Sequence, residues 1–177
     1  ALAHSSLCYV VPTFQNPTGG CYSLAERQSL ARACEQRGTL LFEDDPYRDL
    51  VYDQCERRPV ASLLRHGSFV YQGSFSKTLA PGLRLGYLLA SKDLMPYLTR
   101  LKQAADLHSN RLSQHLERLA TLQRHYRRKR DAFAAALDQH MAPMASWQEP
   151  CGGLFFGSNY ISAQTRTSCC SRLWPTG

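Results

Sequence analysis

The sequence LCYVVPTFQNPTGGCYSLAERQSLARACEQRGTLLF, residues 7–42, has the pattern of a strand, a helix and a second strand. Leu7–Val11 and Thr39–Phe42 are short apolar runs, which are typical of buried strands. Between them, a capping-box pattern begins at Ser23, and Gly38 ends the helical periodicity. This order within so short a stretch predicts a βαβ unit, and therefore a sheet that is at least partly parallel.

Further elements follow along the chain. Residues 69–72 and 85–90 predict two more strands, and residues 73–84 between them predict a loop or a short helix. The periodicity is helical over residues 93–141, and residues 152–156 (GGLFF) predict a strand that enters a second domain. The expected fold is α/β: a partial large domain with a mostly parallel sheet and flanking helices, then the start of a small C-terminal domain.

These elements divide the chain into three parts. Residues 1–105 are expected to form the partial large domain, and residues 106–157 a long helix and the start of the small domain. Residues 158–177 have neither helical nor strand periodicity and are rich in Ser, Thr, Arg and Cys. We expect this tail to be disordered or translated out of frame. One back-translation of residues 161–177, shifted by two bases, gives the amphipathic pattern QRADTHILLQPALAHG.

Composition restricts the class of protein. The 177 residues are 44% hydrophobic and 20% charged, as in globular domains. They contain no apolar run of the roughly 18 residues that a membrane span needs. The N-terminus has no signal-peptide pattern, and the seven cysteines are odd in number and form no C-x-x-C pair. We therefore expect a cytoplasmic protein with free thiols, no metal site and no membrane partner.

The net charge is +7, and much of it lies in Arg124–Arg130 (RHYRRKR). A positive excess favours an anionic partner such as a phosphate group or a nucleic acid. No zinc-finger spacing or aromatic stacking surface accompanies this run, so a solvated helix face explains it better than a nucleic-acid contact.

Three motifs follow the first three predicted strands, at the positions where open α/β sheets bind their ligands. They are Asn16–Gly19 (NPTG), Asp44–Tyr47 (DDPY) and Ser74–Lys77 (SFSK). The third motif continues into a Pro-Gly turn and Arg84.

Each motif offers a defined chemistry. Ser74, Ser76 and Arg84 supply the hydroxyl donors and the guanidinium that bind a phosphate. Lys77 is a candidate nucleophile, because burial or a nearby cation can leave its amine partly deprotonated. Asp44 can pair with a protonated ring nitrogen of a cofactor, and this pairing lets the cofactor ring accept electrons.

Two neutral donors complete the set, because Tyr47 and Asn16 can each donate a hydrogen bond to a phenolate oxygen. Every motif also has a structural explanation when it is taken alone. Lys77 could be a surface lysine, Asp44 and Asp45 could cap a helix, and Asn16 could belong to an ordinary Asn-Pro turn.

In this order and spacing, the three motifs resemble the fold-type-I pyridoxal-phosphate (PLP) enzymes, specifically the class I/II aminotransferases. The segments FQNPTG, EDDPYRDL and GSFSKTLAPGLRLGY are similar to the branch with 2-aminoadipate-type aminotransferases and the aminotransferase-like domains of GntR-type regulators. The resemblance covers residues 7–156. It implies PLP as the cofactor, an amino acid and a 2-oxo acid as substrates, and a homodimer in the intact family member.

The resemblance also implies a role for each site residue. Lys77 would form the internal aldimine with PLP and move protons at the substrate α-carbon, while Asp44 would keep the pyridine nitrogen protonated. The remaining residues would bind the cofactor: Tyr47 and Asn16 its ring oxygen, and Ser74, Ser76 and Arg84 its phosphate. The Asn16–Pro17 bond is cis in related enzymes.

Two other functions stay open. In the first, the chain is the PLP-sensing domain of a GntR-type transcription regulator, and nucleic acid is a partner only through a winged helix upstream. Asn16 favours the enzyme, because many of these regulators have an aromatic residue at that position. In the second, the same fold catalyses decarboxylation or racemisation, which the segment SKTLAPGLRLG makes less favoured.

The sequence departs from the family pattern in three places. The family's N-terminal portion, with its phosphate loop and its ring-stacking aromatic residue, has no counterpart here. No arginine matches the one that binds the substrate carboxylate, and the helical stretch 114–126 is shorter than usual. We therefore expect a fragment that folds poorly alone and has little or no transaminase activity, because a parallel sheet without its neighbours exposes apolar edges.

The proposed shift of reading frame is directly testable. We expect the DNA through codons 150–177 to contain a nearby insertion or deletion whose correction restores a helical pattern after residue 160. Sequencing the gene is the measurement. A single intact frame without such a change would contradict the hypothesis.

Overall fold

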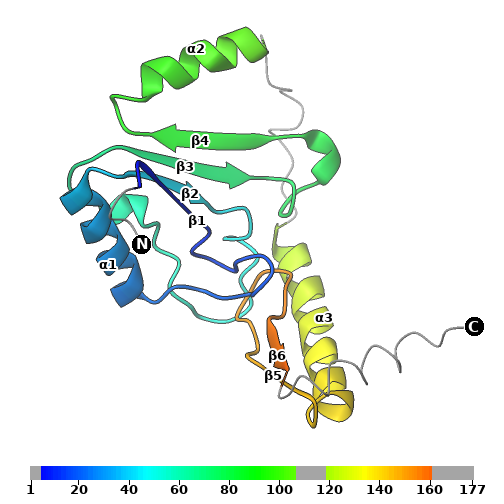
Figure 1. Cartoon of the computed structure of the whole chain (residues 1–177). Coiled ribbons are helices and arrows are strands. Elements are labelled where there is room, and N and C mark those ends of the chain that lie inside the picture. The colour runs from blue at the N-terminus through cyan, green and yellow to red at the C-terminus, as the bar shows by residue number, and fades with distance from the viewer. Residues whose placement is uncertain (1–4, 107–118, 161–177) are drawn as a thin grey trace, which may run out of the picture.

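A four-stranded sheet forms the centre of the computed structural model, which describes residues 5–106 and 119–160 (Figure 1). The strands are β1 (Leu7–Val10), β2 (Leu40–Asp44), β3 (Phe69–Ser74) and β4 (Gly86–Ala90), in the order β1-β2-β3-β4. β1, β2 and β3 are parallel, whereas β4 is antiparallel to β3. The α/β class and the mostly parallel sheet are confirmed.

Helix α1 (Leu24–Arg37) connects β1 to β2. The Ser23 hydroxyl accepts from the Glu26 amide, and the Glu26 carboxylate accepts from the Ser23 amide, so the predicted capping box is present. Gly38 ends the helix with a φ of 62°, a left-handed conformation that favours glycine. The βαβ unit expected from residues 7–42 is therefore confirmed.

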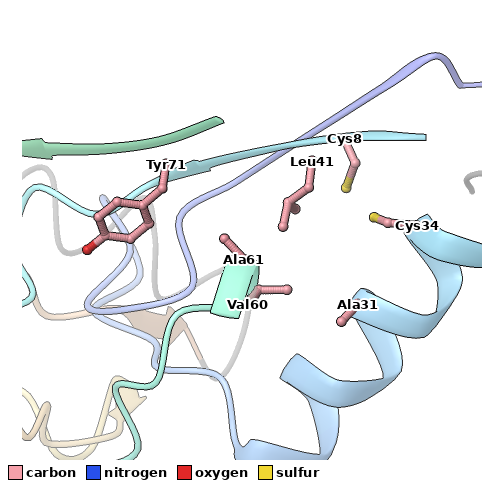
Figure 2. Packing of buried hydrophobic residues seen from close by; sticks show 7 residues of the cluster. All are labelled: Cys8, Ala31, Cys34, Leu41, Val60, Ala61 and Tyr71. Carbon is pink, nitrogen blue, oxygen red and sulfur yellow. The ribbon is translucent and has the colours of Figure 1, made fainter. Parts of the chain in front are cut away.

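The main core lies between α1 and one face of the sheet (Figure 2). Its buried members come from α1, from β1 to β3 and from a short 3-10 turn, Ala61–Leu63: Cys8, Ala31, Cys34, Leu41, Val60, Ala61 and Tyr71. The strand predicted at Leu7–Val11 is present, but it is buried on only one face. Leu7 and Tyr9, which alternate with Cys8, are 50% and 57% exposed, because α1 covers only the face on which Cys8 lies.

The C-terminal part contains α2 (Met95–Ala105), α3 (Leu119–His140) and a two-stranded antiparallel sheet. Its strands are β5 (Ala145–Trp147) and β6 (Ser158–Tyr160). The helical prediction over residues 93–141 is met by α2 and α3, while residues 107–118 lie outside the described part. No described helix is long and apolar enough to cross a membrane.

The strand predicted at residues 152–156 is wrong. Gly152 forms only an isolated bridge with Val51, and Gly153 has a φ of 78°, which is incompatible with an extended strand. A β-carbon at either glycine would lie within 2.5 Å of Phe14 atoms, so this segment packs tightly on an aromatic ring. β6 also begins inside the tail expected from residue 158, and the rest of that tail, 161–177, lies outside the described residues.

A buried arginine connects α1 to the loops around it. The Arg27 side chain is 0% exposed, and its guanidinium donates hydrogen bonds to backbone and side-chain groups around it. Its acceptors are the carbonyl oxygens of Pro12, Tyr22, Glu56 and Arg58, at 2.8 to 3.1 Å, and the Thr13 hydroxyl at 3.0 Å. A charge that is removed from water is tolerated when its donors are all paired in this way.

We expect Arg27→Met to lower the free energy of unfolding by about 3 kcal/mol or more, because it leaves several buried carbonyl groups without a donor. Urea denaturation of the purified chain measures this. Arg32→Met is the matched control: Arg32 is exposed on the same helix, and its loss is expected to cost about 0.5 kcal/mol or less. Equal losses in the two variants would contradict the assignment.

Candidate active site

The three sequence motifs lie at the carboxyl ends of β1, β2 and β3. Because these strands are parallel, the segments that follow them emerge at the same edge of the sheet. Asn16 lies in the loop after β1, Asp44 is the last residue of β2, and Ser74 is the last residue of β3. One polar residue of each motif therefore lies at the edge of the sheet where a ligand is expected to bind.

Asp44 is half-buried and is held from both neighbouring strands. Its Oδ2 accepts from the Tyr9 hydroxyl at 2.6 Å, and its Oδ1 accepts from Gln72 Nε2 at 3.4 Å. The hydrogen bond to Asp44 is the main cause that raises the pKa of Tyr9 to about 12; burial and the charge of Asp44 add to it. No helix begins at Asp44, so the explanation of this residue as a helix cap is wrong.

The adjacent carboxyl group has a different environment. Asp45 is 3% exposed, its Oδ2 accepts from the Tyr71 hydroxyl at 3.0 Å, and Arg48 Nη1 donates to the same hydroxyl at 3.2 Å. Its Oδ1 has no hydrogen-bond partner in the described part of the chain. Burial raises the pKa of Asp45 to about 6, against the opposing effect of the Tyr71 hydrogen bond. Asp45 is therefore enclosed by the protein, whereas Asp44 is half-buried at the edge of the sheet.

Tyr47 follows Asp44 by three residues, in the turn after β2. It is buried, and its ring meets the Phe155 ring edge-to-face with centroids 5.4 Å apart. The second motif therefore places Tyr47 in a fixed position close to Asp44 in the chain.

The proposed phosphate residues surround one cavity of about 360 Å³. Ser74, Ser76 and Arg84 line it together with Gln72, the residue that donates to Asp44. The Ser76 amide donates to Ser74 Oγ at 3.2 Å, which fixes the turn between the two serines. Arg84 has a φ of 50°, an uncommon conformation for a residue with a side chain, at the end of the 3-10 turn that precedes β4. Two hydroxyls and a guanidinium around a cavity of this size fit an anionic group.

Lys77 and Asn16 are less tightly placed. Both are exposed, and no side-chain hydrogen bond or ion pair is recorded for either within residues 5–106 and 119–160. Lys77 is not among the residues that line the phosphate cavity. The burial that would activate its amine is not provided by the part of the chain that the structure describes. The Asn16–Pro17 bond is cis, as expected.

Sequence reasoning missed two residues that hold the site. Tyr9 was assigned to an apolar core strand, and Gln72 was only the end of another strand. Both could have been found from the parallel register, which pairs Asp44 with Gln72 and places Tyr9 beside Phe42. No described group of three or more His, Cys, Asp or Glu residues could hold a metal ion.

Comparisons with known proteins agree with this geometry. A family model described as "Aminotransferase class I and II" matches residues 4–163. The chain is 37% identical over 160 residues to the 2-aminoadipate transaminase of Thermus thermophilus, which covers 83% of this chain and 40% of that protein. An HTH-type transcriptional regulator of Bacillus subtilis is 31% identical over 160 residues, 84% of this chain and 33% of the regulator.

A solved structure gives the same picture. The α-aminoadipate aminotransferase of Thermus thermophilus, crystallised with N-(5'-phosphopyridoxyl)-L-leucine, matches with a TM-score of 0.76 at 36% identity. The match covers 88% of this chain and 44% of that one. The present chain thus spans about two fifths of the length of the aminotransferases that it resembles.

The buried Asp45 predicts a pH dependence of stability. Its folded pKa of about 6 exceeds the ordinary 3.8, so the folded chain holds this proton more tightly than the unfolded chain. The stabilisation of the folded chain by this proton is fully present below about pH 4 and is lost as the pH rises through about 6. We expect Asp45→Asn to remove about 2 kcal/mol of this pH-dependent change in unfolding free energy.

Urea denaturation at several pH values between 4 and 7 measures the effect. Asp138→Asn, at an exposed carboxyl group on α3, is the matched control and is expected to keep the wild-type dependence. The assignment fails if Asp45→Asn and wild type show the same slope.

Proposed function

Because the chain belongs to the class I and II aminotransferase family, we propose that it is the cofactor-binding part of a PLP-dependent aminotransferase. The reaction is the transfer of an amino group from an amino acid to a 2-oxo acid. The observation that supports this most strongly is Asp44, a carboxylate at the end of a central parallel strand, held by Tyr9 and Gln72 next to the cavity of Ser74 and its neighbours.

The residues present fit PLP. The cofactor carries a phosphate, a ring nitrogen and a ring oxygen, and when bound it supplies an electron sink for the substrate's α-carbon. Ser74, Ser76 and Arg84 bind the phosphate at the cavity that they line. Asp44 keeps a proton on the ring nitrogen, with Tyr9 and Gln72 fixing the direction of its two oxygens.

The remaining site residues act at the other end of the ring. Tyr47 and Asn16 donate hydrogen bonds to the ring oxygen. Lys77 would hold the cofactor through its amine, and the same amine would accept the proton from the substrate's α-carbon. Tyr47 is the more firmly positioned of the two donors, because its ring is buried against Phe155.

The proposal includes a cellular setting and an assembly. Five cysteines in the described part of the chain are free thiols, which supports a cytoplasmic location. A homodimer is proposed for the intact family member from the resemblance described above.

A second candidate function is the PLP-sensing domain of a GntR-type regulator. The 31% identity to the Bacillus subtilis regulator favours it. In that case the same residues bind PLP, while DNA contacts belong to a winged helix. A winged-helix coding segment directly upstream in the gene would favour the regulator over the enzyme.

The proposed role of Lys77 is tested by borohydride trapping. We expect PLP mixed with the purified chain and then reduced to label Lys77 with about one equivalent, because this lysine follows the strand that carries the phosphate residues. Mass spectrometry of the digested chain locates the label. Lys77→Ala should lose it, whereas Lys92→Ala, at another exposed lysine, should keep it.

Label spread evenly over the exposed lysines, or unchanged in Lys77→Ala, would overturn the assignment of Lys77. Turnover is a separate measurement: amino-group transfer between an amino acid and a 2-oxo acid by the protein that takes the label supports the enzyme. The regulator is supported by the upstream winged-helix coding segment and not by a lack of turnover, because a fragment of the enzyme is also expected to be inactive.

A further inference from the structure

Three cysteines lie around one cavity outside the candidate active site. Cys21, Cys55 and Cys151 line a cavity of about 300 Å³, and all three are half-buried. None of them takes part in the proposed chemistry. They come from three distant stretches of the chain: the loop before α1, the loop after the second motif and the segment after β5.

Cys55 and Cys151 line the same cavity from two segments of backbone that are bonded to each other. Burial is the main cause that raises the pKa of Cys55 to about 12, and the interaction with the Cys151 thiol adds to it. The backbone holds the two segments in place, because the amides of Tyr52 and Asp53 donate to the Cys151 carbonyl at 2.8 and 3.0 Å. Val51 and Gly152 form an antiparallel bridge next to these bonds.

Cys21 is held in a different way. Its thiol donates to the Glu56 carbonyl at 3.1 Å, and the buried Arg27 donates to its sulfur at 3.6 Å. These contacts make Cys21 part of the hydrogen-bond network around Arg27. Cys55 and Cys151 are therefore the two thiols that are free to react with each other.

The chain has a second pair of adjacent thiols, Cys8 and Cys34, in the core between β1 and α1 (Figure 2). They are 9% and 2% exposed, so a dissolved reagent has little access to them. Among the described cysteines, access and proximity coincide only at the cavity of Cys21, Cys55 and Cys151, and there Cys21 is held by Glu56 and Arg27.

We propose that Cys55 and Cys151 form a dithiol site that reacts with low-molecular-weight disulfides of the glutathione type and closes to an intramolecular disulfide. One thiolate attacks the small disulfide, forms a mixed disulfide and releases one small thiol. The second protein thiolate then attacks the protein sulfur of the mixed disulfide and releases the other small thiol. The two cysteines lose two electrons and two protons, and the small disulfide gains them as two thiols.

The local environment sets the speed of this exchange. A thiol with a raised pKa is seldom a thiolate at neutral pH, so closure is slow there and accelerates as the pH rises. The same thiol is a poor leaving group, so the closed disulfide reopens slowly.

Closure would bind the loop after the second motif to the segment that carries Phe155. The Phe155 ring packs on Tyr47, so the cross-link would fix a contact of the candidate site. It would add a covalent bond where the Tyr52 hydroxyl already donates to the Gly153 carbonyl.

Oxidation of the reduced full chain by oxidised glutathione tests the proposal. After iodoacetamide quenching and trypsin digestion without reductant, we expect a cross-link between peptide 49–57, which contains Cys55, and peptide 131–166, which contains Cys151. Two of the five thiols in the described part of the chain should be lost, and the rate should rise between pH 7 and pH 9. Cys55→Ser and Cys151→Ser should each abolish the cross-link, and Cys21→Ser should keep it.

Oxidation of the same chain in urea controls for chance pairing, and there we expect several pairs instead of one. Circular dichroism is the check on the variants, which are expected to keep the wild-type secondary structure. The wild-type peptide map does not depend on the variants. A dominant cross-link that contains Cys21, stable glutathione adducts without a cross-link, or the same mixture of pairs with and without urea would each overturn the proposal.

Discussion

The buried guanidinium of Arg27 is the interaction on which the arrangement of the loops depends. It donates to carbonyl oxygens after β1, before α1 and in the loop 56–58, so one side chain pairs backbone groups from three separate stretches. Those stretches flank the loop that carries Asn16 and the segment that follows Tyr47. Without the guanidinium, the carbonyl oxygens of these three stretches would lose their donor, and water molecules would have to donate to them instead.

Local patterns predicted the local structure correctly. The capping box at Ser23 and the left-handed Gly38 fix the two ends of α1, and the apolar runs on both sides fix β1 and β2, because each of these depends on residues close in sequence. The strand expected at Gly152–Phe156 failed because its geometry depends on Phe14, far away in the sequence. A GGLFF segment is apolar enough for a strand, yet Gly152 and Gly153 serve there to let a ring approach the backbone.

The candidate site shows the same division. The choice of Asp44, Ser74, Ser76 and Arg84 as candidates came from motifs, since these residues lie at strand ends or beside a tight turn. The different environments of Asp44 and Asp45 could not be predicted in that way, because the burial of Asp45 depends on Tyr71 from the neighbouring strand. Tyr9 was missed for a related reason: its hydroxyl group acts across the sheet on a residue of the next strand.

Because β4 is antiparallel to β3, the cavity beside Ser74 is lined mainly by residues that lie close together in the sequence. Ser74 pairs with Gly86, so the end of β3 and the start of β4 meet through the short connection 75–85, which contains Ser76 and Arg84. The Asp44 position, in contrast, needs Tyr9 from β1 and Gln72 from β3, and hence a loop closure across most of the sheet. Closing a short loop loses less chain entropy than closing a long one. The hairpin of β3 and β4 is therefore the part of the candidate site that can assemble first as the chain folds, and Asp44 joins it only when the sheet is complete.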